Sequence, residues 1–241
     1  MDKIKVILNP YAGRWLASRL RPVIEETLTA LDVPFELELT TKPGTGIEMA
    51  RQASLDGFSV VVAAGGDGTV SEVVNGLALA ADDLGKPTAG ILGVLPVGSA
   101  NDMAEIAGVP IQLRAACEAI KRGRTRRIDL GVVNGRYFDN NVGAGFEAQV
   151  TIESRKIKLL RGTLLYLIAV FRALSHYPSP TMRITWDDGE LQRSLLMVSI
   201  GNGRRTGGGF FVTPDAVQDD GLLDLGVANA LPRLKILHLL P

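Results

Sequence analysis

The sequence predicts an α/β protein whose first half is an open, mostly parallel sheet with helices on both faces, followed by a mostly antiparallel second domain. Three observations support this prediction. Apolar segments typical of strands alternate with helical patterns in the first half, a glycine-rich turn joins a buried strand to a helix, and hairpin signals dominate the second half. At 241 residues the chain is long enough for one large or two small domains.

Strands and helices of the first half are predicted from hydrophobic periodicity. Apolar runs or alternating apolar residues indicate strands, and apolar residues three or four positions apart indicate helices. Pro22 must lie in the first turn of its helix or kink it, and Gly123 ends the last helix. Ligands of such sheets bind at the carboxyl ends of the strands. The expected strands are 4–8, 35–39, 60–64 and 91–95, and the expected helices are 16–31, 47–55, 70–81 and 113–120.

The second half carries the signals of antiparallel structure. Two dipeptides, Asn134-Gly135 and Asp188-Gly189, each predict a hairpin. One convincing helical pattern remains, over 157–174. We therefore expect an α/β domain over 1–127 and a β-rich domain over 128–241. The strand-like segments that flank the two dipeptides are 130–133 with 137–142, and 182–186 with 195–200.

Composition argues against several classes of function. A formal net charge of zero argues against a nucleic-acid partner. The single cysteine, Cys117, excludes an internal disulfide and favours a reducing cytosol. The two histidines, His176 and His238, lack nearby Cys or His partners, which argues against a zinc site or a Ser–His triad. The longest apolar run, 164–171, is too short to span a membrane.

A basic stretch lies at the expected domain junction. Such a run is typical of a solvated linker, and a surface that faces phosphates is the alternative. Its members are Lys121, Arg122, Arg124, Arg126 and Arg127.

The most informative segment is the turn Ala63-Ala64-Gly65-Gly66-Asp67-Gly68-Thr69-Val70-Ser71-Glu72, which follows a buried strand and opens a helix. Glycines let the backbone approach an anion, and the free N–H groups of a helix N-terminus attract negative charge. Because a carboxylate repels a phosphate, Asp67 suits a site where Mg²⁺ lies between them or where it takes a proton from an attacking group. The spacing fits neither a P-loop nor a dinucleotide fingerprint. The alternative is an ordinary tight turn with Asp67 or Thr69 as the helix N-cap.

A second strand-end motif is Leu95-Pro96-Val97-Gly98-Ser99-Ala100-Asn101-Asp102, which offers a small turn, a hydroxyl and an amide. The carboxyl ends of parallel strands meet at one edge of a sheet. We therefore expect four segments to converge there: Asn9-Pro10, Thr40-Thr41, the glycine-rich turn and the loop 96–102.

Together with Asn9-Pro10-x-x-Gly13, these motifs strongly resemble the diacylglycerol kinase catalytic domain family, which includes bacterial lipid kinases and sphingosine kinases. The resemblance implies a nucleotide-binding α/β domain followed by a β-sandwich-like domain. It also implies transfer of the γ-phosphate of ATP to a lipid hydroxyl with Mg²⁺. The resemblance continues at Asp129, 140–146, 201–203, 207–209, Pro214 and 220–223.

The resemblance further implies roles for particular residues. Asp67 is the expected catalytic residue, acting as acid–base group or through the metal. Mg²⁺ is expected at the Val217 and Leu222 carbonyls and the Asp220 carboxylate, and oxygen ligands suit this hard cation. Ser99 stands where the family often has threonine and keeps the hydroxyl. The expected ATP contacts are Asn9, Thr40, Gly65, Gly66, Asp67, Gly68, Thr69, Val70, Ser71, Glu72 and Ser99.

In one respect the chain departs from the family. Relatives run on for some tens of residues past this chain and carry a catalytic carboxylate in that tail, whereas here an amphipathic helical pattern over 234–240 stops in mid-pattern. We therefore expect the second domain to be incomplete at its end, and the catalytic base is left open. Little kinase activity is expected of the 241-residue chain, and more of an extended one.

The acceptor is expected to come from a membrane surface, as in phospholipid biosynthesis. The helix over 157–174 offers an apolar wall with basic neighbours, and the alternative is that it only covers the core of the second domain. This favours a cytoplasmic protein that contacts the inner membrane face peripherally, without a transmembrane segment, and leaves a homodimer open. Two other functions remain open: a kinase for a soluble acceptor, of the NAD kinase type that shares the GGDGT turn, and a nucleotide- or lipid-binding module without catalysis.

Overall fold

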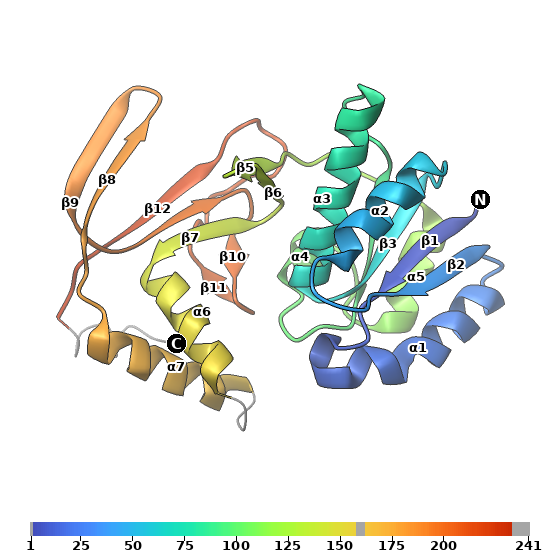
Figure 1. Ribbon diagram of the computed structural model, residues 1–241, viewed down its shortest axis with the longest axis horizontal. Helices are drawn as coiled ribbons and strands as arrows, with labels where there is room; N and C mark the ends of the chain where they lie inside the picture. Colours follow the sequence, from blue (N-terminus) through green and yellow to red (C-terminus); the bar gives the residue numbers. More distant parts are fainter. Residues whose placement is uncertain (1, 158–161, 233–241) are drawn as a thin grey trace. The chain divides into compact units, whose positions relative to one another are not determined.

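Four parallel strands form the first sheet of the computed structural model, which describes residues 2–157 and 162–232 (Figure 1). The strands are β1 (Ile4–Leu8), β2 (Phe35–Leu39), β3 (Val60–Gly65) and β4 (Ile91–Pro96). They lie in the order β2-β1-β3-β4. The predicted open parallel sheet is therefore confirmed.

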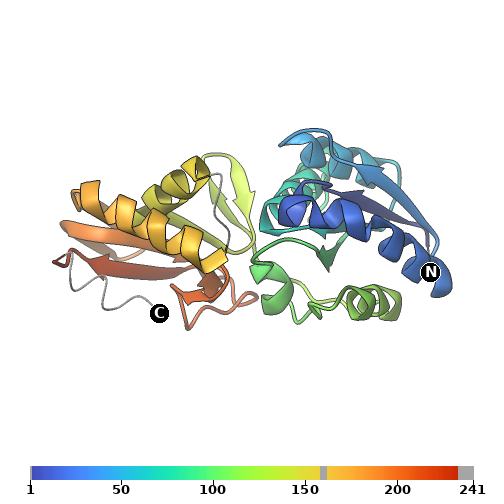
Figure 2. The same cartoon turned by 90° about the horizontal axis from the view of Figure 1, so that it is seen from below.

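Helices cover both faces of this sheet (Figure 2). Successive residues of a strand point to opposite faces, so Val6 of β1 belongs to one buried cluster and Ile7 to the other. The first cluster includes residues of α1 (Ala12–Ala30) and α5 (Leu113–Arg122). The second includes residues of α2 (Thr45–Leu55), α3 (Asp67–Leu84) and α4 (Asp102–Ile106).

The ends of these helices follow the local sequence. Gly123 takes the left-handed conformation after α5 and ends it, as predicted. The start of α1 is not regular, because Gly13, Arg14 and Trp15 have positive φ angles, so regular helix begins only after Trp15. Pro22 lies inside α1, beyond its first turn, where its missing N–H removes one helical hydrogen bond.

The chain divides into two compact units. The first comprises Met1–Asn140 with Asn202–Leu222, and the second comprises Asn141–Gly201 with Leu223–Pro241. The returning segment adds the short pair β10 (Arg205–Thr206) and β11 (Phe210–Phe211) to the first unit. The domain boundary expected between residues 127 and 128 stays a prediction.

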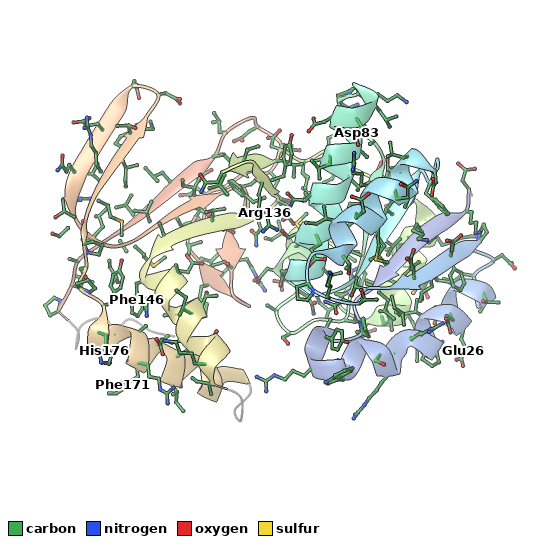
Figure 3. The ribbon with its side chains drawn as sticks, viewed as in Figure 1. Glu26, Asp83, Arg136, Phe146, Phe171 and His176 are labelled. Carbon is green, nitrogen blue, oxygen red and sulfur yellow. The ribbon has the colours of Figure 1, made fainter. Side chains whose placement is uncertain are left out.

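The hairpin predicted at Asn134-Gly135 is present in the first unit. It joins β5 (Gly131–Val133) to β6 (Arg136–Phe138), and both turn residues have positive φ, as a type I′ turn requires. The Asn75 side chain of α3 donates to the Tyr137 carbonyl at 2.9 Å and accepts from the Tyr137 N–H at 3.0 Å. This pair of bonds fixes the hairpin, which carries the labelled Arg136, to α3 (Figure 3).

An antiparallel sheet and two helices make up the second unit. The sheet has the order β12-β9-β7, with β8 paired to β9. Figure 2 shows α6 and α7 together on one side of this sheet, and they share with β9 a buried cluster that includes Phe146, Val170 and Leu196. The elements are β7 (Asn141–Gly145), α6 (Phe146–Lys156), α7 (Gly162–His176), β8 (Thr181–Trp186), β9 (Gly189–Gly201) and β12 (Asp224–Asn229).

Three sequence predictions for the second half need correction. The helix predicted over 157–174 is present as α7, but Ile157 has an extended backbone and does not belong to it, and a further helix, α6, precedes it. Helix α6 was missed because the β-branched residues Val150, Thr151 and Ile152 weaken its helical signal, and packing overrides that preference. The strand 137–142 is split between β6 and β7. In the second hairpin the turn is Asp187-Asp188, since Gly189 already pairs with Trp186.

The predicted helix over 234–240 lies outside the described residues, as do Leu159 and Leu160 of the predicted apolar wall and its basic neighbours Lys158 and Arg161. Within the described part of α7, one face is buried in the core at Ala169 and Val170, whereas Leu167 and Phe171 are exposed. Among the helices that the structure describes, we find none with the length and apolar character needed to cross a membrane.

Candidate functional site

A pocket opens at the carboxyl edge of the first sheet, where the loops that follow β1, β2, β3 and β4 meet. Its volume is about 530 Å³, which falls in the range of small-molecule sites. We call it the strand-end pocket. The convergence of four loops expected from the sequence is therefore observed. The pocket is lined by Asn9, Tyr11, Ala12, Gly13, Thr40, Thr41, Lys42, Pro43, Gly66, Gly68, Thr69, Glu72, Gly98 and Ser99.

The N-terminus of α3 contributes Gly66, Gly68 and Thr69 to the pocket wall. The N-cap of α3 is Gly66, in extended conformation and without a side-chain capping bond, so neither Asp67 nor Thr69 is the N-cap. Gly68 faces open space. A Cβ atom on Gly98 would lie 2.2 Å from the Cα of Gly66, so glycine is what allows these two loops to approach so closely. Exposed N–H groups at a helix N-terminus attract anions, and this arrangement suits a phosphate.

Polar side chains hold the loops around the pocket in place. Asn9 donates from its amide to the Thr69 hydroxyl at 3.1 Å, which ties the loop after β1 to α3. Glu72 accepts from the backbone N–H groups of Gly44 at 2.8 Å and Gly46 at 2.9 Å, which ties the loop after β2 to the same helix. The carboxylate of Glu72 therefore organises the pocket through its loops.

Seven of the eleven residues expected to contact ATP line the strand-end pocket: Asn9, Thr40, Gly66, Gly68, Thr69, Glu72 and Ser99. The other four do not line it. Val70 points into the core between α3 and the sheet, and Gly65 is the buried last residue of β3. Asp67 and Ser71 also lie outside the lining. The ATP contacts themselves stay predictions.

Asp67, the expected catalytic residue, is directed toward the start of α4. Its Oδ1 accepts a hydrogen bond from the Met103 N–H at 3.1 Å. Burial raises the pKa of the Asp67 carboxyl above its usual value, the bond from Met103 opposes this rise, and the charge of Asp102 adds to it. The motif thus presents backbone to the pocket and its carboxylate to α4.

Two more carboxylates influence this region. Asp102 accepts from Arg205 Nε at 3.2 Å and from the Gly208 N–H at 2.9 Å, so it holds the returning segment. Burial raises the pKa of Asp139 to about 6, a bond to its own backbone N–H opposes this, and the charge of Asp67 adds to the rise. Asp67 therefore interacts unfavourably with two other carboxylates, Asp102 and Asp139.

Sequence reasoning missed several residues of this region. Lys42 is the single basic residue among the described residues that line the strand-end pocket, and Tyr11 adds an aromatic wall. Both follow strand ends, so their position could have indicated them. Asp139 carries a recognisable signal too, because it directly follows the strand residues Tyr137 and Phe138 and is only 6% exposed. A buried carboxyl group is unusual unless it has a hydrogen-bond or charge partner or takes part in function.

The residues expected to hold Mg²⁺ lie in the returning segment of the first unit. Asp220 Oδ1 accepts from the Leu222 N–H at 3.0 Å, and the neighbouring Gly221 N–H donates to Asp129 Oδ2 at 2.7 Å. The described residues contain no group of three or more His, Cys, Asp and Glu side chains that could hold a metal ion. A cation here would depend on the Val217 and Leu222 carbonyls besides the second Asp220 oxygen, and such a set of hard oxygen donors fits Mg²⁺.

Comparison with known families covers nearly the whole chain. Residues 3–133 match the diacylglycerol kinase catalytic domain. Residues 140–241 match the YegS C-terminal NAD kinase beta sandwich-like domain. The predicted fold class, with a β-sandwich-like second half, agrees with these matches.

Individual relatives carry consistent names. The chain is 36% identical over 201 residues to a protein of Chromohalobacter salexigens described as a probable lipid kinase YegS-like, covering 83% of this chain and 63% of that protein. It is 32% identical over 227 residues to the diacylglycerol kinase of Bacillus subtilis, covering 93% of this chain and 73% of that protein. The chain thus spans less than two thirds of the first relative's length.

A solved structure has a similar fold. The crystal structure of a diacylglycerol kinase from Bacillus anthracis superposes with a TM-score of 0.73 at 25% identity, covering 95% of this chain and 76% of that one. Family, sequence and structural similarity agree. The chain belongs to the diacylglycerol kinase catalytic domain family.

Proposed function

We propose that this protein transfers the γ-phosphate of ATP to the hydroxyl of a diacylglycerol-like lipid. The observation that carries the proposal is the strand-end pocket, in which the N-terminus of α3 and the Gly98-Ser99 turn face one cavity. Phosphoryl transfer requires little covalent chemistry from the protein, and positioning with charge stabilisation suffices. Membership of the diacylglycerol kinase family supports the same reaction.

In this proposal the phosphates of ATP lie against the backbone at Gly66 and Gly68, where the helix dipole favours negative charge. The Ser99 hydroxyl donates to a phosphate oxygen, and Lys42 adds a positive charge at the mouth. Asn9 and Glu72 keep the loops in register through the bonds described above. Asp67, which lies beside α4, either accepts the proton of the acceptor hydroxyl or acts through a metal ion near the phosphates.

Mg²⁺, when bound, supplies charge neutralisation for the phosphate groups. The Val217 and Leu222 carbonyls and the Asp220 carboxylate do not line the strand-end pocket, so the Mg²⁺ proposed at these residues would be a separate ion that holds the returning segment. The lipid would be met at a membrane surface. The exposed Leu167 and Phe171 of α7 support such contact, and Phe171 lies on the outer side of that helix (Figure 3).

The first experiment measures ATP binding by titration. Lys42→Gln should weaken the affinity for ATP by about fivefold to tenfold, because one charge-assisted contact is lost. Lys86→Gln is the matched control, since Lys86 follows the opposite end of α3 and is exposed. Equal affinities in the two variants would contradict the placement of ATP.

The second experiment is a phosphotransfer assay with labelled ATP and Mg²⁺ against diacylglycerol, sphingosine, phosphatidylglycerol and NAD. Label in diacylglycerol or another lipid supports the lipid kinase proposal. Label only in NAD would assign a soluble acceptor instead. ATP binding without transfer to any acceptor would indicate a binding module.

A further inference from the structure

A second cavity of about 300 Å³ lies in the first unit and shares no residue with the strand-end pocket. We call it the arginine pocket. Residues from α4, the segment before β5 and the returning segment 202–222 form it, and all of them belong to the first unit. Its lining residues are Glu105, Ile106, Arg126, Arg204, Arg205, Phe211, Ala216, Val217, Gln218 and Asp219.

The three arginines of this pocket differ in their partners. Arg205 is neutralised by ion pairs with Asp102 and Glu105. Arg126 donates only to neutral acceptors, the Ile106 carbonyl at 3.0 Å and the Gln218 side-chain oxygen at 2.5 Å. Arg204 likewise donates to a neutral acceptor, the Ala216 carbonyl at 3.0 Å. Within the described residues, two guanidinium groups therefore line one cavity without an acidic partner.

The neutral bonds also fix how these two guanidinium groups are oriented. Arg126 uses Nη2 for both of its bonds, and Arg204 uses Nε. The remaining N–H donors, on Nε and Nη1 of Arg126 and on Nη1 and Nη2 of Arg204, have no protein acceptor in the described structure. Guanidinium groups held in this way match the oxygens of a phosphate group, which accept paired hydrogen bonds.

From these observations we propose that the arginine pocket binds a phosphate group. Arg126 and Arg204 supply two positive charges against Asp219, the one acidic lining residue that is not paired with Arg205. The cavity is at the small end of ligand sites, which suits a phosphate group rather than a whole nucleotide. Phe211, which also lines the pocket, is 65% exposed, so an apolar group attached to the phosphate could pack against its ring. The phosphate could belong to a lipid headgroup or to a free phosphate compound.

The members of the basic stretch found in the sequence differ in their relation to the arginine pocket. All three of Arg122, Arg124 and Arg126 are exposed, and of these only Arg126 lines the pocket. The double substitution R122Q/R124Q removes the same charge as R126Q/R204Q from the same unit. It therefore serves as the charge-matched control.

Direct binding can be followed with inorganic phosphate. In an NMR titration of the full chain, phosphate should shift the side-chain N–H signals of Arg126 and Arg204 saturably, whereas chloride at equal ionic strength should not. Arg204→Lys, which keeps the charge but loses the paired donors, should weaken this binding about tenfold. Shifts that grow linearly and match those with chloride would overturn the proposal, because they would indicate screening alone.

Vesicle binding distinguishes the two sources of phosphate. If a lipid headgroup is the ligand, wild type and R122Q/R124Q should bind vesicles of phosphatidylcholine with phosphatidylglycerol about tenfold more tightly than R126Q/R204Q does. If wild type and R126Q/R204Q bind these vesicles equally while inorganic phosphate still titrates Arg126 and Arg204, a free phosphate compound is the ligand. Absence of both effects overturns the proposal. Thermal unfolding of each variant verifies that it is folded before binding is measured.

Discussion

The turn at Gly66-Asp67 has two sides of opposite character. Toward the strand-end pocket it offers backbone N–H groups, open space beside Gly68 and the nearby hydroxyl of Ser99. Toward α4 it places the Asp67 carboxylate, with Asp102 and Asp139 close enough to repel it. One side favours an anion, and the other concentrates negative charge.

The two sides of the motif depend on different structural features. The pocket side depends on the absence of side chains, because glycines let two loops approach and leave helix N–H groups uncovered. The α4 side depends on carboxylates that burial makes less acidic. Substitutions on the pocket side should therefore change stability through loop packing, and those on the α4 side should change catalysis or the pH dependence of stability.

The largest effect is expected for Asp67→Asn. The substitution keeps an oxygen that can accept from the Met103 N–H and removes the charge. We expect kcat of phosphotransfer to fall at least about 100-fold, equivalent to about 3 kcal/mol of transition-state stabilisation. The melting temperature and the affinity for ATP should stay near the wild-type values.

Steady-state kinetics with the lipid that the acceptor assay identifies provides the measurement. Ser71→Ala, at another polar residue of the motif that lies outside the pocket lining, serves as the control. Activity close to wild type in Asp67→Asn would assign Asp67 to the structural support of α4 alone.

The second prediction concerns pH. Burial raises the pKa of Asp139 from 3.8 to about 6, so the folded state binds more protons than the unfolded state between these two values. Stability should therefore fall as pH rises from about 4 to about 6, by up to about 3 kcal/mol. Asp139→Asn should remove this slope and be more stable than wild type above pH 6.

Urea unfolding at a series of pH values measures the effect. Asp215→Asn, at an exposed position of the same unit, should leave the slope unchanged. An unchanged slope in Asp139→Asn would show that its carboxyl group does not cause the pH dependence.

The contrast between the two sides also shows what the sequence could predict. The strands of the first sheet and the hairpin at Asn134-Gly135 were predicted because period and turn chemistry are local properties. Helix α6 was not, because tertiary packing of Phe146 and Val150 determines it. The split between β6 and β7 was missed for a similar reason, since pairing with β9 begins only at Asn141.

The same limit applies to the site. Strand ends and glycines predicted where the pocket would lie, because parallel topology brings strand ends together. The direction in which a side chain points could not be predicted in the same way, because it depends on contacts with other elements. The role of Asp67 beside the phosphates stays a prediction, and the bond that its carboxylate accepts from the Met103 N–H could not be predicted from the sequence. Glu72 lines the pocket, and its expected contact with the nucleotide stays a prediction, but its bonds from two backbone N–H groups of the loop after β2 were not predicted.

The third prediction tests the pocket side with two alanines. In Gly98→Ala the new Cβ would lie 2.2 Å from Gly66 Cα, so the loops must separate, at a cost of about 1–3 kcal/mol in unfolding free energy. In Gly68→Ala the new Cβ meets open space, and stability should hold or rise by about 0.5–1 kcal/mol because alanine favours helix. Urea midpoints measure both variants. Equal destabilisation of the two would contradict the close approach of the loops.

The smallest effect is expected for Glu72→Gln. The carboxylate accepts from Gly44 and Gly46 at the N-terminus of α2, where the helix dipole also favours negative charge. Glutamine keeps one acceptor and turns an N–H donor toward a second N–H, so we expect a loss of about 1 kcal/mol and a fall of about 2–4 °C in Tm.

Glu26→Gln is the matched control for this change, because Glu26 is exposed on α1 (Figure 3) and should leave Tm unchanged. Glu72 holds the loop after β2, which carries Thr40 and Lys42. Its substitution should therefore weaken ATP binding indirectly, by letting these two pocket residues move. The loss of affinity should therefore stay smaller than that of Lys42→Gln. A larger loss, with Tm unchanged, would mean that Glu72 contacts the nucleotide directly and that the pocket side, too, depends on a carboxylate.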